Sequence, residues 1–441
     1  MDHICLCLYA LYFWGCSVYA VLAPFYPAKA EAKGMSKQSI GYLFSLYALV
    51  AFMFSPVSGK VMNKIGRRNV LMIGGVLESI GMFIFAFVID LEGNAFIVFS
   101  VIARILMGAG GSALLVTCFA VISNQYPNDM EEKIGLMETL GGVGLMSGPA
   151  LGGLLYEFTG YKFVFIFYTV LFLALTTYTF KILPEDRPDK EKSESSIKYT
   201  EIFSIGKIVL TLIVVIFGMA GPGFLEPVLE TNLENSLGLS TLWVGIFFAL
   251  PTLGYTVAMK LLTMIPKEVD RRHVLFAGLF IEGLSFILLG PFSFFGSPNI
   301  ILKAISLTTL GFGSAWAYIP SLPLLIETAS ERMPGIDKEI LSNTLSTLMG
   351  TTHYLGETLG PIVGGVSVHH FGDQDGYALF GVLILTYFLI YGIINKQFQA
   401  LINRDCLVHE DQRNIIAMDS QTPSNSNKYD VIEFAESAQH N

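Results

Sequence analysis

Charged residues are scarce in this sequence. Only 14% of the 441 residues are Asp, Glu, Lys or Arg, against 53% hydrophobic residues. A soluble globular chain carries about 25% charged residues. Together with a mean hydropathy of +0.58, this composition excludes a soluble enzyme, a disordered protein and a collagen-like chain. It is typical of a membrane protein with many spans.

Several functional signatures are also missing. The net charge is −9 and Lys and Arg form no basic cluster, so we expect no nucleic-acid partner. The sequence has no HExxH, GxSxG or Walker motif, so we expect no enzyme, no cofactor and no nucleotide as the energy source. The cysteines have no paired spacing and predict neither disulfides nor a metal site. They are Cys5, Cys7, Cys16, Cys118 and Cys406.

Long apolar segments fill most of the chain. Because a transmembrane helix needs about 20 mostly apolar residues, the sequence predicts an all-α membrane protein with twelve such helices, each bounded to within a few residues. The first has no basic region or cleavage site before it, so we interpret it as a helix and not as a signal peptide. The spans are 4–23, 38–58, 70–90, 95–122, 134–157, 161–183, 206–229, 241–265, 273–295, 300–326, 340–367 and 377–394.

Polar segments divide the chain into four parts. Residues 184–205 contain the only long polar break between spans, which reads as a solvated linker. This linker separates a six-helix bundle over 1–183 from a second bundle over 206–396. Residues 397–441 are rich in Ser, Asn and Asp, and we predict a disordered tail.

Lys and Arg predict the orientation in the membrane. They concentrate in the connections after even-numbered spans, which places these connections and both termini in the cytoplasm. In the tail, residues 411–416 and 429–432 resemble sorting signals that bind adaptors, which favours a vesicle or an endosomal or lysosomal membrane. The basic residues are Lys60, Lys64, Arg67, Arg68, Lys267, Arg271 and Arg272, with Lys29, Lys33 and Lys37 as exceptions in the first connection.

The two predicted bundles resemble each other in sequence. Segments 67–78 and 271–282 share a double Arg, Val-Leu, Gly and Glu at the same spacing. The fifth and eleventh spans share the pattern G-x-x-x-G-P-x-x-G-G. A duplicated six-helix unit is the simplest explanation, and it is a known transporter plan with substrate bound between the halves. The shared residues are Gly144, Gly148, Pro149 and Gly152 in the first copy, and Gly356, Gly360, Pro361 and Gly364 in the second.

Glycines at four-residue spacing let helices pack closely, and a proline bends its helix. We therefore expect these two segments to form the surface on which the halves rock. Ordinary glycine packing without gating is the alternative.

Three motifs resemble those of the major facilitator superfamily. Residues 59–68, GKVMNKIGRR, are similar to its loop motif between the second and third spans, with Asn63 where most members have Asp. The glycine motif of the fifth span resembles the antiporter motif of the family. Arg104 and Gly108 are similar to an Arg-x-x-x-Gly motif that the family associates with proton coupling. The resemblance implies two pseudo-symmetric six-helix bundles and alternating access. The matching loop residues are Gly59, Gly66, Arg67 and Arg68.

Three further segments, 22–27, 63–66 and 224–227, resemble the vesicular amine transporters of solute carrier family 18, and the stretch 134–156 resembles the polyamine-transporting branch. This resemblance implies proton-driven antiport of an organic cation, a polyamine or another amine, into an acidic vesicle. A plasma-membrane efflux carrier for drugs or metabolites and a transporter-like receptor that no longer transports remain the alternatives.

Glu226 is the first candidate for the substrate site. A charge at mid-membrane costs about 2.5–3.5 kcal/mol on insertion scales, so it needs a reason. Glu226 lies between the Gly-Pro-Gly of 221–223 and Pro227, where we expect irregular backbone that lines a cavity. Its carboxylate would hold a substrate ammonium or a proton. The alternative is a carboxylate near water at the end of its span.

Other buried charges are candidates for proton coupling. A fixed ion pair or a satisfied core residue is the alternative for each of them. Glu78 and Glu282 occupy matching places in the repeat, and we expect them to have a scaffold role by pairing with the loop arginines. The coupling candidates are Glu138, Arg104, Glu357 and His353.

Aromatic rings attract cations, so a cavity for an organic cation should be lined by them. Packing or lipid contact is the alternative for each ring. The candidates are Tyr19, Tyr47, Trp316 and Tyr318.

Overall fold

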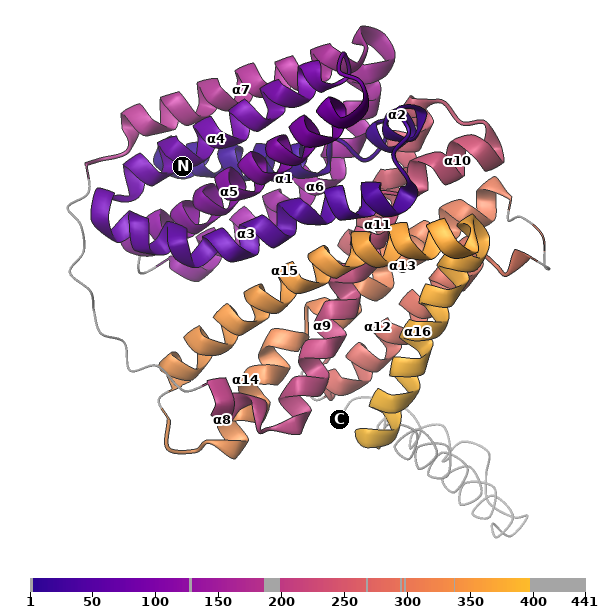
Figure 1. Ribbon diagram of the computed structural model, residues 1–441. Coiled ribbons are helices and arrows are strands. Elements are labelled where there is room, and N and C mark those ends of the chain that lie inside the picture. Colours follow the sequence, from indigo (N-terminus) through magenta and orange to yellow (C-terminus); the bar gives the residue numbers. More distant parts are fainter. Residues whose placement is uncertain are drawn as a thin grey trace, which may run out of the picture. The chain divides into compact units, whose positions relative to one another are not determined.

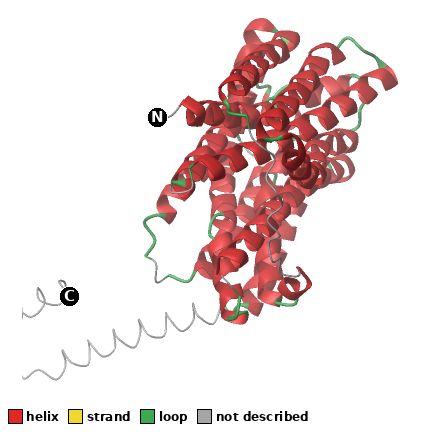
Figure 2. Ribbon diagram, turned by 90° about the vertical axis from the view of Figure 1, so that its left-hand side faces the viewer, coloured by secondary structure: helices red, strands yellow, loops and turns green. Residues whose placement is uncertain are grey.

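The computed structural model describes residues 3–126, 129–185, 199–266, 269–293, 296, 299–336 and 338–396. These residues form helices and connecting loops, and no strand occurs among them (Figure 2). Ten helical segments are long and apolar enough to cross a membrane. The predicted all-α membrane fold is therefore confirmed. The predicted sorting signals of the tail and most of the predicted linker, 186–198, lie outside the described residues.

Most helices match the predicted spans to within a few residues, and shorter helices lie between them (Figure 1). They are α1 (His3–Ala20), α2 (Tyr26–Ala32), α3 (Lys37–Ile65), α4 (Arg67–Val88), α5 (Gly93–Gln125), α6 (Met130–Thr159), α7 (Tyr161–Ile182), α8 (Tyr199–Phe203), α9 (Gly206–Leu225), α10 (Leu229–Leu237), α11 (Thr241–Leu262), α12 (Arg271–Leu289), α13 (Ile300–Tyr318), α14 (Ser321–Arg332), α15 (Lys338–Phe371) and α16 (Asp373–Ile394).

Two predicted spans differ from the observed helices. The span predicted over 206–229 ends at Leu225 as α9, and the separate helix α10 begins at Leu229. The span predicted over 300–326 is divided, because α13 ends at Tyr318 and α14 begins after Pro320. Proline has no backbone N–H to donate and clashes with the preceding turn, which explains the second break.

The first half, α1–α7, and the second half, α9–α16, share one packing scheme. Helix α4 packs against α5 as α12 packs against α13, and α1 packs against α6 as α9 packs against α15. Two helix pairs join the halves. Helix α3 packs against α15, and α6 packs against α11. Figure 1 shows α15 running beside α3.

The repeated glycine motif packs each of its helices against a neighbour in the same half. A Cβ atom added at Gly148 of α6 would lie 2.5 Å from the Ser17 carbonyl oxygen of α1. A Cβ atom added at Gly360 of α15 would lie 2.5 Å from the Ala220 carbonyl oxygen of α9. Only a hydrogen fits at these positions, so the backbones approach more closely than any other residue would allow.

The last glycine of each motif faces the other half. A Cβ atom added at Gly153 of α6 would lie 2.8 Å from the Thr241 carbonyl oxygen of α11, and one added at Gly365 of α15 would lie 2.6 Å from the Lys37 carbonyl oxygen of α3. The Pro361 carbonyl oxygen also closely approaches Gly41 of α3. Each motif therefore holds its own half together on one helix face and contacts the opposite half on another.

We expect Gly148→Ala to destabilise the protein by about 1–3 kcal/mol, because the added methyl group overpacks the α1–α6 contact. Gly142 lies on the same helix with no atom near its missing Cβ. Gly142→Ala is therefore the matched control, and it should leave stability unchanged or raise it slightly through helix propensity. Thermal unfolding of the purified protein in detergent measures both. Equal melting temperatures for the two variants would contradict the packing argument.

Candidate functional site

Glu226 lies where the backbone of the second half leaves its helix. Helix α9 contains Pro222 and ends at Leu225, and Glu226 begins the turn that leads to α10. Its Oε2 atom is buried and has no hydrogen-bond partner among the described residues. Because Gly223 has no side chain, this segment packs closely against Pro361 of α15. The predicted irregular backbone is present, although it begins at Glu226 and the Gly-Pro-Gly segment remains helical.

Two residues of the first half face Glu226. The Tyr19 hydroxyl of α1 is the hydrogen-bonding neighbour of its carboxylate. Arg104 of α5 is its electrostatic neighbour of opposite charge. The electrostatic interaction of Glu226 with Arg104 and its link to Tyr19 thus span the seam between the halves, which is where a transporter binds its substrate.

Arg104 is fully buried. Its guanidinium nitrogens have no hydrogen-bond partner among the described residues. The guanidinium lies 4.8 Å from the centre of the Phe44 ring and 5.9 Å from that of Tyr47. An arginine stays protonated even when buried, so aromatic faces and the nearby carboxylate offset the cost of its charge.

His353 lies between Tyr318 and Glu357, two other residues that the sequence predicts for the site. Its Nδ1 atom lies 3.1 Å from the Tyr318 hydroxyl, and its Nε2 atom lies 3.2 Å from the Glu357 Oε1 atom. Glu357 is in turn an electrostatic neighbour of Glu226 and Tyr19. The structure therefore brings Tyr318, His353 and Glu357 together in a chain that adjoins the Glu226 site.

The aromatic candidates divide into two groups. The Tyr19 and Tyr47 rings are 4.8 Å apart in an edge-to-face arrangement beside Glu226 and Arg104. Trp316 donates instead to the Ala258 carbonyl oxygen of α11 at 3.3 Å. Trp316 and Tyr318 are two residues apart on α13, which places their side chains on nearly opposite helix faces. Trp316 therefore contributes to helix packing.

Two predicted residues lie in helices whose side chains are not described at those positions. Glu138 lies in α6 and Asn63 in α3. Their expected roles stay predictions.

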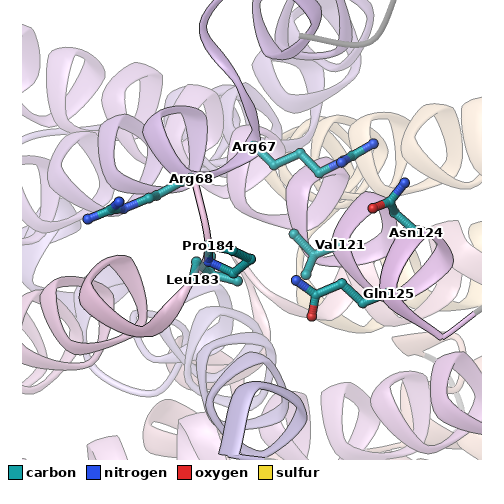
Figure 3. Close-up of a pocket in the computed structure, with 7 residues that line it drawn as sticks. All are labelled: Arg67, Arg68, Val121, Asn124, Gln125, Leu183 and Pro184. Carbon is teal, nitrogen blue, oxygen red and sulfur yellow. The ribbon is translucent and has the colours of Figure 1, made fainter. Parts of the chain in front are cut away.

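The loop motif forms the sharp connection between α3 and α4. Gly66 ends α3 and precedes α4 with φ +86°, a conformation that favours glycine. Arg67 and Arg68 line the pocket of Figure 3 together with residues at the ends of α5 and α7. The Arg68 Nε atom donates to the Phe180 carbonyl oxygen at 2.7 Å. A Cβ atom added at Gly59 would meet no atom of another helix within 4 Å among the described residues.

The expected pairing of Glu78 and Glu282 with loop arginines is wrong. Arg68 pairs with Glu185, and Arg271 pairs with Glu327. Glu78 and Glu282 are both fully buried. They lie eleven residues along their helices from the first loop arginine, which is about 16 Å at 1.5 Å per residue.

Polar contacts join the halves at the end that carries α2 and α10. The Ala28 N–H donates to the Glu230 Oε2 atom at 2.9 Å, and Lys37 pairs with Asp373 at 2.6 Å. At the opposite end, the described ion pairs Arg68–Glu185 and Arg271–Glu327 each stay within one half. We call the end that carries α2 and α10 the α2–α10 end. Because these contacts join the two halves there, this end is closed in this structure.

A polytopic helical protein built from two matched halves, with charged residues at the seam, has the architecture of a secondary transporter. The sequence model of the Major Facilitator Superfamily matches residues 5–337. The chain therefore belongs to this superfamily.

The chain is similar to named transporters of this superfamily. The chain is 30% identical to the mouse MFS-type transporter SLC18B1 over 378 residues, which are 84% of this chain and 81% of that protein. It is 25% identical to the human synaptic vesicular amine transporter over 350 residues, which are 79% of this chain and 65% of that protein. The chain is thus a transporter related to the amine transporters of solute carrier family 18, as its motifs predicted.

Solved structures support the fold. The nucleoside transporter NupG superposes with a TM-score of 0.68 at 15% identity, covering 90% of this chain and 100% of that one. A D-xylose-proton symporter superposes with a TM-score of 0.68 at 16% identity, covering 88% and 95%.

The α2–α10 end contains a carboxyl that should respond to pH. Burial raises the pKa of Glu230 well above its ordinary value; the Ala28 N–H bond and Lys29 act against this shift without reversing it, and the nearby Glu234 and Glu31 reinforce it. A raised pKa means that the closed end favours the protonated form. Closure is therefore strongest in acid, and it weakens as the pH rises through the raised pKa.

We expect spin labels at Ala32 and Asn235 to report a short distance at acidic pH and a larger share of long distances at neutral pH. Double electron–electron resonance measures this distribution in the reconstituted protein. Glu230→Gln, which cannot ionise, should make the distribution independent of pH. A wild-type distribution that is the same at both pH values would refute this role of Glu230.

Proposed function

We propose that this chain is a proton-coupled antiporter that moves an organic cation, with polyamines as the best candidates, into an acidic compartment by alternating access. The observation that carries the proposal is the Glu226 carboxylate, whose Oε2 atom is buried at the seam between Tyr19 and Arg104. A carboxylate in this position is costly in lipid, and such residues mark substrate and ion pathways.

The exchange depends on the Glu226 carboxyl group, for which a substrate ammonium and a proton compete. The ionised Glu226 carboxylate pairs with a substrate ammonium. When the ammonium leaves, a proton neutralises the carboxylate, because an unpaired buried charge is costly. Substrate and proton therefore occupy the site in turn. Tyr19 and Tyr47 supply ring faces that add about 0.5–2 kcal/mol of attraction for a cation.

The chain of Tyr318, His353 and Glu357 provides a second polar group beside this site. The His353 Nε2 atom lies 3.2 Å from the Glu357 Oε1 atom, which places an imidazole, a side chain that can donate or accept a hydrogen bond, next to a carboxylate. Glu357 also gives a second carboxylate near Glu226. Two carboxylates suit a linear polyamine, which carries several ammonium groups, better than a substrate with one.

The similarity to transporters named for vesicular amines supports the same conclusion about substrate class. The predicted orientation would place both termini in the cytoplasm and the α2–α10 end toward the compartment interior. An acidic interior would then favour closure at that end through Glu230, while the cytoplasmic side admits substrate.

Reconstitution tests this function. The full chain in proteoliposomes with an imposed pH gradient is offered labelled spermidine, serotonin and acetylcholine side by side. We expect uptake of spermidine, and we expect Glu226→Gln to reduce it by roughly 30-fold or more. Loss of one partner of a buried charge pair costs about 2 kcal/mol or more.

Glu157 is the matched control, since it is an exposed carboxylate near the end of α6. Glu157→Gln should transport as the wild type does. If none of the three cations is taken up, the proposed substrate class is wrong. If Glu226→Gln takes up spermidine as the wild type does, the proposed role of Glu226 is wrong.

A further inference from the structure

Carboxylates from both halves gather at the α2–α10 end, where α2 packs against α10 (Figure 1). Glu31 lies on α2, Glu230 and Glu234 lie on α10, and Asp373 begins α16. Lys37 pairs with Asp373 at 2.6 Å and interacts electrostatically with Glu31 as well. One lysine therefore serves two of these carboxylates, and the two carboxylates of α10 need another cation.

Lys29 of α2 is the oppositely charged neighbour of both Glu230 and Glu234. Its Nζ atom lies 6.0 Å from the centre of the Tyr156 ring of α6, at the outer limit of a cation–π contact. Lys29 is exposed, and the described part of the chain provides no direct ion pair for its ammonium group. Another cation can therefore take its place.

Aromatic rings of the first half form the wall of this place. Tyr156 stacks on Phe25 with ring centres 5.0 Å apart, and Phe25 meets the Tyr161 ring edge-to-face at 5.8 Å. Tyr161 of α7 is only 8% exposed, and its hydroxyl is buried without a hydrogen-bond partner among the described residues. This hydroxyl interacts electrostatically with Glu230. Because an unpaired buried hydroxyl destabilises the fold, its presence beside a carboxylate indicates a role in binding.

These groups together fit a primary alkylammonium. The carboxylates supply opposite charge, the Tyr156 ring supplies a cation–π face, and the Tyr161 oxygen can accept a hydrogen bond from an N–H group. The Lys29 side chain is itself a primary ammonium on a flexible four-carbon stem. The group that fills this place in the structure thus has the same chemistry as one end of a linear polyamine.

Two other lysines of the first half show what distinguishes Lys29. Lys33 pairs with Glu92 at 2.6 Å, and Lys162 pairs with Asp90 at 2.6 Å. Both lysines also lie over an aromatic ring. Their carboxylates belong to the same half as the lysines, whereas the carboxylates that face Lys29 belong to the other half. Opening of the α2–α10 end therefore separates Lys29 from its carboxylates and leaves the other two pairs intact.

We propose that the α2–α10 end contains a second binding site, which takes a primary ammonium group of the departing substrate, and that Lys29 occupies this site while the end is closed. This inference rests on the proposed antiport and adds a release step to it. When the halves separate at this end, the substrate ammonium replaces Lys29 beside Glu230 and Glu234. When the substrate has left, Lys29 returns and the end closes.

Acid favours release from this site. Burial raises the pKa of both Glu230 and Glu234, and Lys29 opposes the shift without reversing it. Glu31 of α2 and Tyr161 of α7 also face Glu230. Because the raised pKa makes these carboxyls neutral at a higher pH than usual, they lose their attraction for an ammonium as the pH falls. The cation then leaves into an acidic interior.

Equilibrium binding of labelled spermidine to the purified full chain in lipid nanodiscs tests the second site. Glu226→Gln removes the charge of the central site, so the binding that this variant retains at neutral pH reports the second one. In this background we expect Lys29→Gln to tighten binding about tenfold, because a tethered competitor acts at a millimolar effective concentration. Glu234→Gln should weaken it about tenfold, since a charge partner is lost. Lys162→Gln is the matched control and should bind as the background does.

Photolabelling of the wild-type protein gives a readout that needs no variant. A spermidine derivative with a diazirine group should label peptides of α10 and of the α6–α7 junction, in addition to peptides around Glu226. Unlabelled spermidine should prevent both, and an uncharged diazirine of the same length should label neither.

The outcomes separate this inference from the proposed function. Equal affinities of the Lys29→Gln and Lys162→Gln variants, or a photolabel confined to the surroundings of Glu226, would overturn the second site and leave the antiport intact. A photolabel at the α2–α10 end of a wild-type protein that carries no spermidine across the membrane would overturn the antiport and leave the site.

Discussion

The cost of placing charge in lipid is the constraint on which this structure depends. Arg104 is buried without a hydrogen-bond partner among the described residues, and only the rings of Phe44 and Tyr47 and the Glu226 carboxylate across the seam offset its charge. Glu226 is equally dependent on Tyr19 and Arg104. Each half therefore stabilises a charge of the other.

Close backbone packing supports the segments that carry Tyr19 and Glu226. The glycines of α6 and α15 bind these helices tightly to α1 and α9, which carry Tyr19 and the turn at Glu226. Without side chains in these contacts, the backbones of α1 and α6 lie close together, and so do those of α9 and α15. The positions of Tyr19 and Glu226 thus depend on glycines that carry no charge.

Much of this arrangement could be predicted from the sequence. Apolar length predicted the spans, the internal repeat predicted the matched halves, and the cost of intramembrane charge identified Glu226, Arg104 and Glu357. The break before α14 and the face of Trp316 could not be predicted to the residue, since each depends on neighbouring helices. Glu78 was assigned a scaffold role because its symmetric partner suggested one.

Helix α15 combines two functions on separate faces. His353 and Glu357 project toward the polar cluster, while Gly356, Gly360 and Gly364 contact α9 and Gly365 contacts α3. Substitutions that alter the chemistry of the cluster therefore leave the small-residue faces unaffected. Members of one lineage can acquire different cargoes through a few exchanges on the polar face, while the geometry of their movement is inherited without change.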